Sequence, residues 1–72
     1  MSKPTLKDRL AEAIDEMVDN GIYWSEASAQ FEKLFILKAL AESEGNMSQA
    51  AQTMGVHRNT LSKKVREYKL RR

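Results

Sequence analysis

The stretch that decides the fold is "GNMSQAAQTMGVHRNTLSKKVREYKL", residues 45–70. Asn46 with Gln49 three positions later is typical of a helix start, and Gly55 suits the left-handed conformation that ends a helix. The residues that follow are helical again, because an apolar face recurs at helical spacing in Leu61, Val65 and Tyr68. Two short helices joined by a glycine turn predict a helix-turn-helix.

The second helix of this motif carries polar and basic side chains away from its apolar face. In DNA-binding proteins of this kind, that helix lies in the major groove, with its N-terminal residues on the base edges. Arg58 is the first candidate, as a guanine contact or a phosphate clamp; the alternative is a surface salt bridge. Thr60 either contacts DNA or supports the first turn. Asn59 either reads adenine or faces solvent, and His57 either caps the helix or contacts DNA.

Basic residues are concentrated at this end of the chain. Residues 1–45 hold five bases and nine acids, a net charge of −4, whereas residues 46–72 hold seven bases and one acid, a net charge of +6. The asymmetry indicates that the C-terminal part meets a polyanion, although a solvated helix end with a basic tail at Arg71 and Arg72 has the same composition. Lys63, Lys64 and Arg66 are expected to contact phosphates, which position a protein on DNA without reading its sequence.

Two longer helices are predicted upstream. The first begins at Thr5 with Asp8 and stops at Asn20–Gly21, and its apolar stripe contains Leu6, Leu10, Ile14, Met17 and Val18. The second is predicted from an N-cap at Ser25 to its end at Gly45. The acids of both helices are interpreted as solvent-facing stripes.

The second of these helices has apolar residues on more than one face: Ala27, Phe31, Leu34, Phe35, Ile36, Leu37, Leu40 and Ala41. Such a helix needs two neighbours, and a core of this size supplies only ~3–5 kcal/mol without a disulfide, a metal or a second subunit. Cysteine is absent and there is one histidine, so a second subunit is the option left. The alternative is a monomer with this helix as its central spine.

The predicted fold class is therefore all-α, with four helices in a single domain, residues 1–72. Residues 5–44 are dimerisation helices that pair with their copies in a four-helix bundle, and residues 46–69 are the helix-turn-helix. Tyr23 and Trp24, between the first two helices, are expected to plug the end of the bundle.

Residues 45–70 resemble the C-terminal helix-turn-helix of the Fis family, which is shared with the DNA-binding domains of NtrC-type bacterial enhancer-binding regulators. The family pattern is roughly G-N-x-[ST]-x-A-A-x-x-[LM]-G-[IV]-x-R-x-T-L-x-x-K-[LV]-[KR]-x-Y. Upstream, "FEKLFILKAL", residues 31–40, is similar to the helix that precedes the motif, and a looser match extends back to about Ser25.

This resemblance implies a homodimer with a four-helix core and two helix-turn-helix units, which binds and often bends double-stranded DNA. The contact positions of the family fall on Asn46 and Ser48 at the DNA backbone, Arg58 and Thr60 at the start of the second motif helix, and Lys63 and Lys64 further along it. His57 stands where Fis itself has asparagine, and Ser62 stands where it has arginine. A different base preference is therefore expected.

The sequence predicts a cytoplasmic, nucleoid-bound transcriptional regulator or DNA-bending protein, either on its own or as a domain of a larger regulator. No cofactor, metal or small-molecule ligand is expected, and no apolar run approaches the ~20 residues that span a bilayer. An enzyme is disfavoured, because the single histidine has no positioned carboxylate partner and no cysteine is present. Two alternatives stay open: a dimeric adaptor whose basic face meets an acidic protein, and an RNA-binding protein without recognisable RNA-binding motifs.

Overall fold

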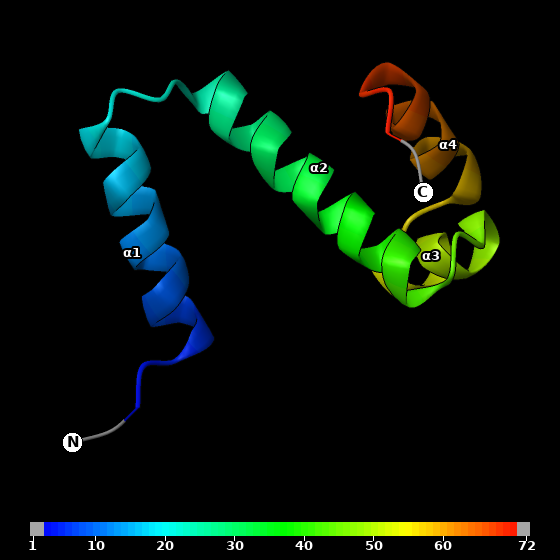
Figure 1. Ribbon diagram of the computed structural model, residues 1–72, viewed down its shortest axis with the longest axis horizontal. Coiled ribbons are helices and arrows are strands. Elements are labelled where there is room, and N and C mark those ends of the chain that lie inside the picture. Colours follow the sequence, from blue (N-terminus) through cyan, green and yellow to red (C-terminus); the bar gives the residue numbers. More distant parts are fainter. Residues whose placement is uncertain (1–2, 71–72) are drawn as a thin grey trace.

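The chain folds into four helices, α1 (Leu6–Asp19), α2 (Trp24–Glu42), α3 (Met47–Met54) and α4 (Arg58–Glu67). The computed structural model describes residues 3–70, and no strand occurs among them; Arg71 and Arg72, the expected basic tail, lie outside the described residues. α1 and α2 diverge from the loop that joins them, and α3 and α4 pack at the far end of α2 (Figure 1). The predicted all-α class with four helices is confirmed.

Two of the predicted helix starts are formed as expected. Thr5 Oγ1 accepts a hydrogen bond from the Asp8 N–H at 3.1 Å, and the Asp8 carboxylate accepts one from the Thr5 N–H at 3.0 Å. Before α3, Asn46 Oδ1 accepts a hydrogen bond from the Gln49 N–H at 3.0 Å. Each cap satisfies a backbone donor that has no partner within its helix.

The start of α2 differs from the prediction. Ser25 is not the N-cap but lies in the first turn, and Tyr23 is the N-cap. The reason is the side chain of Glu26, whose Oε1 accepts a hydrogen bond from the Tyr23 N–H at 3.2 Å. This contact makes α2 begin two residues earlier than an N-cap at Ser25 would.

The end of α2 also differs by one residue. Ser43 is the C-cap, and both Glu44 and Gly45 have positive φ, at 53° and 81°. The Gly45 N–H donates to the Leu40 carbonyl at 2.8 Å and the Glu44 N–H to the Ala41 carbonyl at 3.2 Å, as in a Schellman motif. The first left-handed residue is therefore Glu44, and the predicted glycine follows it.

The core lies between α2, α3 and α4. Its buried apolar members are Ile36, Ala39 and Leu40 of α2, Ala50 and Ala51 of α3, and Leu61 of α4. α3 packs on both α2 and α4, and its two alanines let those helices approach closely. Val65 and Tyr68 complete the inward face of α4, as their spacing predicted.

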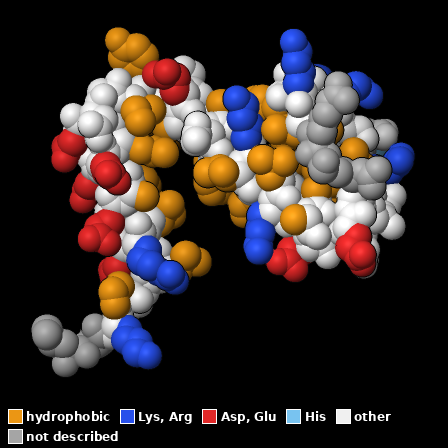
Figure 2. All heavy atoms as spheres, viewed as in Figure 1, with side chains coloured by type: hydrophobic (Ala, Val, Ile, Leu, Met, Phe, Trp, Pro, Cys, Tyr) orange, Lys and Arg blue, Asp and Glu red, His pale blue; other side chains and the backbone are white. Residues whose placement is uncertain are grey.

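α1 contributes nothing to this core. No residue of α1 is buried, and its apolar stripe is exposed at Leu10, Ile14 and Val18. In Figure 2 this stripe lies on the side of α1 toward α2, and the acidic side chains line the outer edge. Tyr23 and Trp24 are 76% and 86% exposed, so the plug predicted for them is not formed within the chain. Over residues 3–70, no helix combines the length and apolarity needed to cross a membrane.

Candidate nucleic-acid interface

The turn between α3 and α4 is built around Gly55. Its φ and ψ are 73° and 29°, the left-handed conformation that the sequence predicted. The Val56 N–H donates to the Ala51 carbonyl at 3.0 Å, which closes the end of α3. A methyl group at Gly55 would meet no other atom within 4 Å, so the backbone conformation alone calls for glycine here.

His57 is the N-cap of α4. Its Nδ1 accepts a hydrogen bond from the Asn59 N–H at 3.1 Å. Of the two roles that the sequence suggests for His57, capping and DNA contact, the structure forms the cap. The His57 side chain is otherwise exposed. The cap also fixes where α4 begins and thus which side chains occupy its first turn.

The outward surface of α4 is polar and basic. With 3.6 residues per turn, Asn59, Lys63 and Arg66 fall on the face opposite the buried Leu61. These three residues are exposed, as are Arg58 and Thr60 in the first turn, whereas Ser62 is half-buried at the edge of this face. Lys and Arg side chains project from this end of the molecule in Figure 2.

The first turn of α3 provides a second polar element. Asn46 and Ser48 are both exposed there. The turn contains no acidic residue, in contrast to the first turns of α1 and α2. The partial positive charge of this helix end is therefore not neutralised from within the helix, a condition that favours a phosphate.

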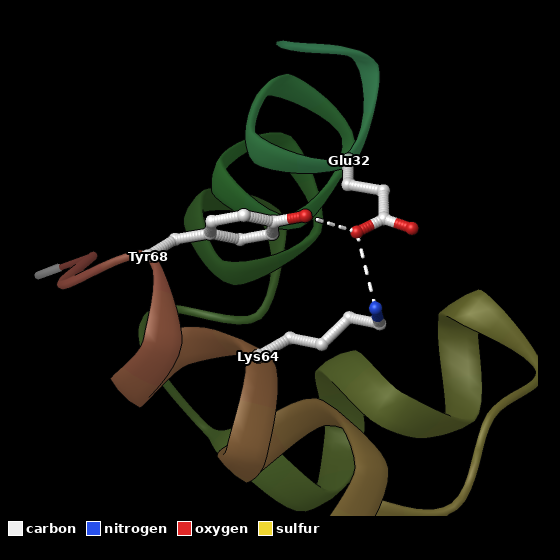
Figure 3. Close-up of polar contacts among 3 residues, drawn as sticks. All are labelled: Glu32, Lys64 and Tyr68. Carbon is white, nitrogen blue, oxygen red and sulfur yellow. Dashed lines mark hydrogen bonds and ion pairs between the residues drawn. The ribbon is translucent and has the colours of Figure 1, made fainter. Parts of the chain in front are cut away.

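Lys64 is oriented differently from the other predicted contacts. Its Nζ lies 3.1 Å from Oε1 of Glu32 on α2, and the Tyr68 hydroxyl donates to the same oxygen (Figure 3). Glu32 is half-buried, so the interpretation of all the acids as solvent-facing stripes is wrong for this residue. No local sequence signal marks this contact, because Glu32 is 32 and 36 positions away from its partners.

The three groups shift one another's protonation. Hydrogen bonds from Tyr68 and then Lys64 hold the pKa of Glu32 below its ordinary value. The bond to Glu32 raises the pKa of both Lys64 and Tyr68. At neutral pH the cluster is therefore an ionised pair with a phenol donor, in which the carboxylate compensates the charge of Lys64.

An apolar groove of about 210 Å³ lies beside this cluster, between α2 and the start of α4. Phe31 and Phe35 line it from α2, and Val56 and Thr60 line it from the turn and the first turn of α4. Thr60 thus lies at the border between this groove and the polar surface. Among residues 3–70, no group of three or more His, Cys, Asp or Glu side chains is arranged to hold a metal ion.

The three helices α2, α3 and α4, with the glycine turn and the polar outer surface of α4, define a helix-turn-helix protein. The sequence profile described as "Bacterial regulatory protein, Fis family" matches residues 28–68, more than half of the chain. The chain belongs to this family. The resemblance seen in residues 45–70 is thereby confirmed, and the family is one of regulators rather than a class of enzymes.

Curated relatives agree with this assignment. The chain is 40% identical over 62 residues to "DNA-binding transcriptional regulator NtrC" of Azospirillum brasilense, covering 86% of this chain and 13% of that protein. It is 42% identical over 53 residues to the protein of the same name from Rhizobium meliloti, covering 74% and 11%. A "Putative Fis-like DNA-binding protein" of Xylella fastidiosa is 49% identical over 35 residues, covering 49% and 39%. The chain thus spans about an eighth of the first relative's length, and no solved structure matches it significantly.

Proposed function

We propose that this chain binds double-stranded DNA as a homodimer, with α4 in the major groove, and acts in transcriptional regulation. The observation that carries the proposal is the surface of α4, which presents Arg58, Asn59, Lys63 and Arg66 to solvent. A helix held on one face by the core and polar on the other is what the major groove admits. Family membership and the names of the relatives support the same function.

The contacts are assigned by position on the motif. Arg58 and Asn59, in the first turn of α4, are proposed to reach base edges, with His57, Thr60 and Ser62 beside them. Lys63 and Arg66 are proposed to neutralise phosphates, and Asn46 and Ser48 to meet the DNA backbone at the start of α3. Lys64 stands apart from this set, because Glu32 already compensates its charge.

The dimer is supported by the open shape of the single chain. Its radius of gyration is 14.4 Å, whereas a compact domain of this length has about 11 Å. It exposes 6290 Å², and a compact monomer of 8.2 kDa exposes about 4,500 Å². Burying the excess of about 1,800 Å² on each of two chains gives the interface size of an obligate dimer.

The exposed apolar residues supply the surface for that interface. α1 offers Leu6, Leu10, Ile14 and Val18, and α2 offers Phe31, Leu34, Phe35 and Leu37, all of which are exposed. We propose that α1 and α2 pair with their copies in a four-helix bundle over residues 5–44. The acidic outer edge of α1 then faces away from the interface, and a bound DNA would be bent between the two α4 helices of a cytoplasmic, nucleoid-bound dimer.

The test is fluorescence anisotropy with a labelled duplex of about 25 base pairs, at several salt concentrations. Arg58→Ala is compared with Arg9→Ala, which removes the same charge from α1 and leaves the motif unchanged. We expect wild type and Arg9→Ala to bind with a steep negative dependence of log affinity on log salt, at about 0.9 per neutralised phosphate. Arg58→Ala should bind more weakly by roughly 1–3 kcal/mol. Sedimentation equilibrium gives the oligomeric state.

A folded protein that fails to bind duplex DNA at low salt would refute the proposal. Preference for single strands or hairpins over the duplex would favour an RNA-binding protein, and absence of nucleic-acid binding would favour an adaptor. A monomer at micromolar concentration would refute the bundle while leaving the surface of α4 to be tested by the same titrations.

A further inference from the structure

Glu32 is the polar link between α2 and α4. It lies near the middle of α2, and Oε1 alone accepts from two donors of α4, the Lys64 ammonium and the Tyr68 hydroxyl (Figure 3). Within residues 3–70 it forms the only ion pair that joins two different helices, since the other pair, Lys38–Glu42, lies within α2. A change at Glu32 therefore acts on how α4 sits relative to α2.

The apolar packing between α2 and α4 is interrupted near the start of α4. α3 packs on both helices. Where α2 faces the start of α4, an apolar groove of about 210 Å³ is lined by Phe35 of α2 and by Thr60 of the first turn of α4. Leu61 is the buried residue of α4, and Val65 and Tyr68 pack against the same core while only partly buried. Apolar packing of this kind limits rotation about the helix axis less sharply than directional polar contacts do.

Three contacts stop that rotation, and all of them come from one turn of α2. Glu32 binds Lys64 and Tyr68, four residues apart on the same side of α4. The ammonium of Lys33 lies 5.4 Å from the centre of the Tyr68 ring, in the range of a cation–π contact. Tyr68 is also the C-cap of α4, so its restraint holds the far end of the helix.

We propose that Glu32 is a positioning residue for DNA recognition: through Lys64 and Tyr68 it sets the orientation in which α4 presents Arg58 and Asn59 to the bases. The proposal rests on the proposed function and explains how α4 is held in the orientation that reads the bases. Base contacts need side chains placed within about 0.5 Å and 10–20° of the productive geometry, so a small rotation of α4 costs discrimination. Contacts with phosphates tolerate such a rotation better, because they do not depend on a base edge.

Glu32 also keeps Lys64 away from phosphates. Removal of the Glu32 carboxylate leaves the charge of Lys64 on α4 uncompensated. The proposal therefore predicts two opposite effects of Glu32→Ala: discrimination between sequences decreases, and binding to any duplex becomes stronger at low salt. A loss of stability alone would weaken both kinds of binding in proportion.

The experiment uses two labelled 25-base-pair duplexes, one selected by the wild-type protein from a randomised pool and one with the same bases in scrambled order. Anisotropy titrations give both affinities, and stoichiometric titration gives the active fraction of each variant. The matched control is Glu42→Ala, which removes an acid from the same helix, where it pairs with Lys38 one turn away. Glu32→Gln tests rescue, because its amide oxygen still accepts from both donors. Tyr68→Phe removes one donor and serves if Glu32→Ala does not fold.

We expect Glu32→Ala to reduce the ratio of selected to scrambled affinity at least about fivefold, the discrimination of one base contact. The salt dependence on the scrambled duplex should become steeper by up to about 0.9 for each α4 helix bound, as its Lys64 reaches a phosphate. Glu42→Ala should leave the ratio unchanged, Glu32→Gln should restore most of it, and Tyr68→Phe should lie between.

Equal ratios for Glu32→Ala and Glu42→Ala, with the wild type discriminating, would overturn the positioning role while leaving DNA binding intact. Parallel weakening on both duplexes with no rescue by Glu32→Gln would also overturn it, in favour of a stabilising role only. Failure of the wild type to bind either duplex would instead refute the proposed function, and this inference with it.

Discussion

Replacing Gly55 with alanine tests how the helix-turn-helix is held at its turn. The φ of Gly55 is +73°, and an added methyl group would meet no atom within 4 Å. The cost is therefore the backbone conformation alone, roughly 1–2 kcal/mol for a residue with a Cβ. Alanine also restricts the unfolded chain, which offsets roughly 0.4–1 kcal/mol. The net destabilisation should be about 1 kcal/mol.

Thermal unfolding followed by circular dichroism measures this change. For a domain of 60–100 residues, 1 kcal/mol corresponds to a decrease in Tm of about 4–8 °C. All variants are compared at one protein concentration, because the proposed dimerisation would make Tm depend on it. The matched control is Gln52→Ala, an exposed position of α3 that should change the free energy of unfolding by less than about 0.5 kcal/mol.

Gly55→Asn separates the cost of the left-handed backbone conformation from the effect of adding a side chain. Asparagine adopts the left-handed conformation more readily than alanine, so this variant should lie between wild type and Gly55→Ala. A Tm of Gly55→Ala equal to that of Gln52→Ala would refute the reasoning, since it would show that the turn reaches another conformation at no cost. An asparagine variant less stable than the alanine variant would refute it as well.

Three further outcomes follow from the structure. Glu44→Gly should stabilise the protein by roughly 1 kcal/mol in urea unfolding, because it relieves a left-handed non-glycine residue and removes an acid from the C-terminal end of α2; a loss of stability would contradict this. Leu10→Lys, on the exposed stripe of α1, should turn the proposed dimer into a monomer in sedimentation equilibrium, and a dimer unchanged by this substitution would place the interface elsewhere. In absorbance titrations Glu32→Gln should lower the raised pKa of Tyr68. The variant Tyr68→Phe leaves Tyr23 as the single tyrosine and so shows which part of the signal belongs to it. The stabilisation from the Tyr68 phenol is complete below its unfolded pKa of about 10 and is lost as pH rises through the higher folded pKa; an unchanged titration would contradict the contact.

The helices were predictable because their signals are local. The caps at Thr5 and Asn46 and the glycines at 21 and 55 act within a few residues, and the structure forms each of them. The two errors in the predicted ends of α2 arose where a neighbouring residue formed a contact that the capping rule for a single residue does not consider. Glu26 reached back to Tyr23 and displaced the expected serine cap, and a Schellman motif placed Glu44 in the conformation expected of the glycine.

In the candidate site, too, the sequence predicted the features that depend on neighbouring residues and missed those that depend on distant ones. The position of Arg58 in the first turn of α4 follows from the glycine turn and the cap at His57, both of which the sequence marks. The orientation of Lys64 does not follow, because its partner Glu32 is far away in sequence and belongs to another helix. Helical periodicity places Lys64 beside the apolar face, but only the packing of α4 against α2 shows which group meets it.

α2 connects the two proposed activities of the chain. One side of it buries Ile36, Ala39 and Leu40 against the motif, and the rest of its surface exposes the phenylalanines and leucines proposed for the dimer. Because one helix carries both surfaces, the distance between the two α4 helices of a dimer is set by how α2 packs on its copy. The contact of Glu32 then sets the rotation of each α4 on that frame. Substitutions in the bundle should therefore change the preferred spacing of half-sites, whereas substitutions at Glu32 should change discrimination within each half-site.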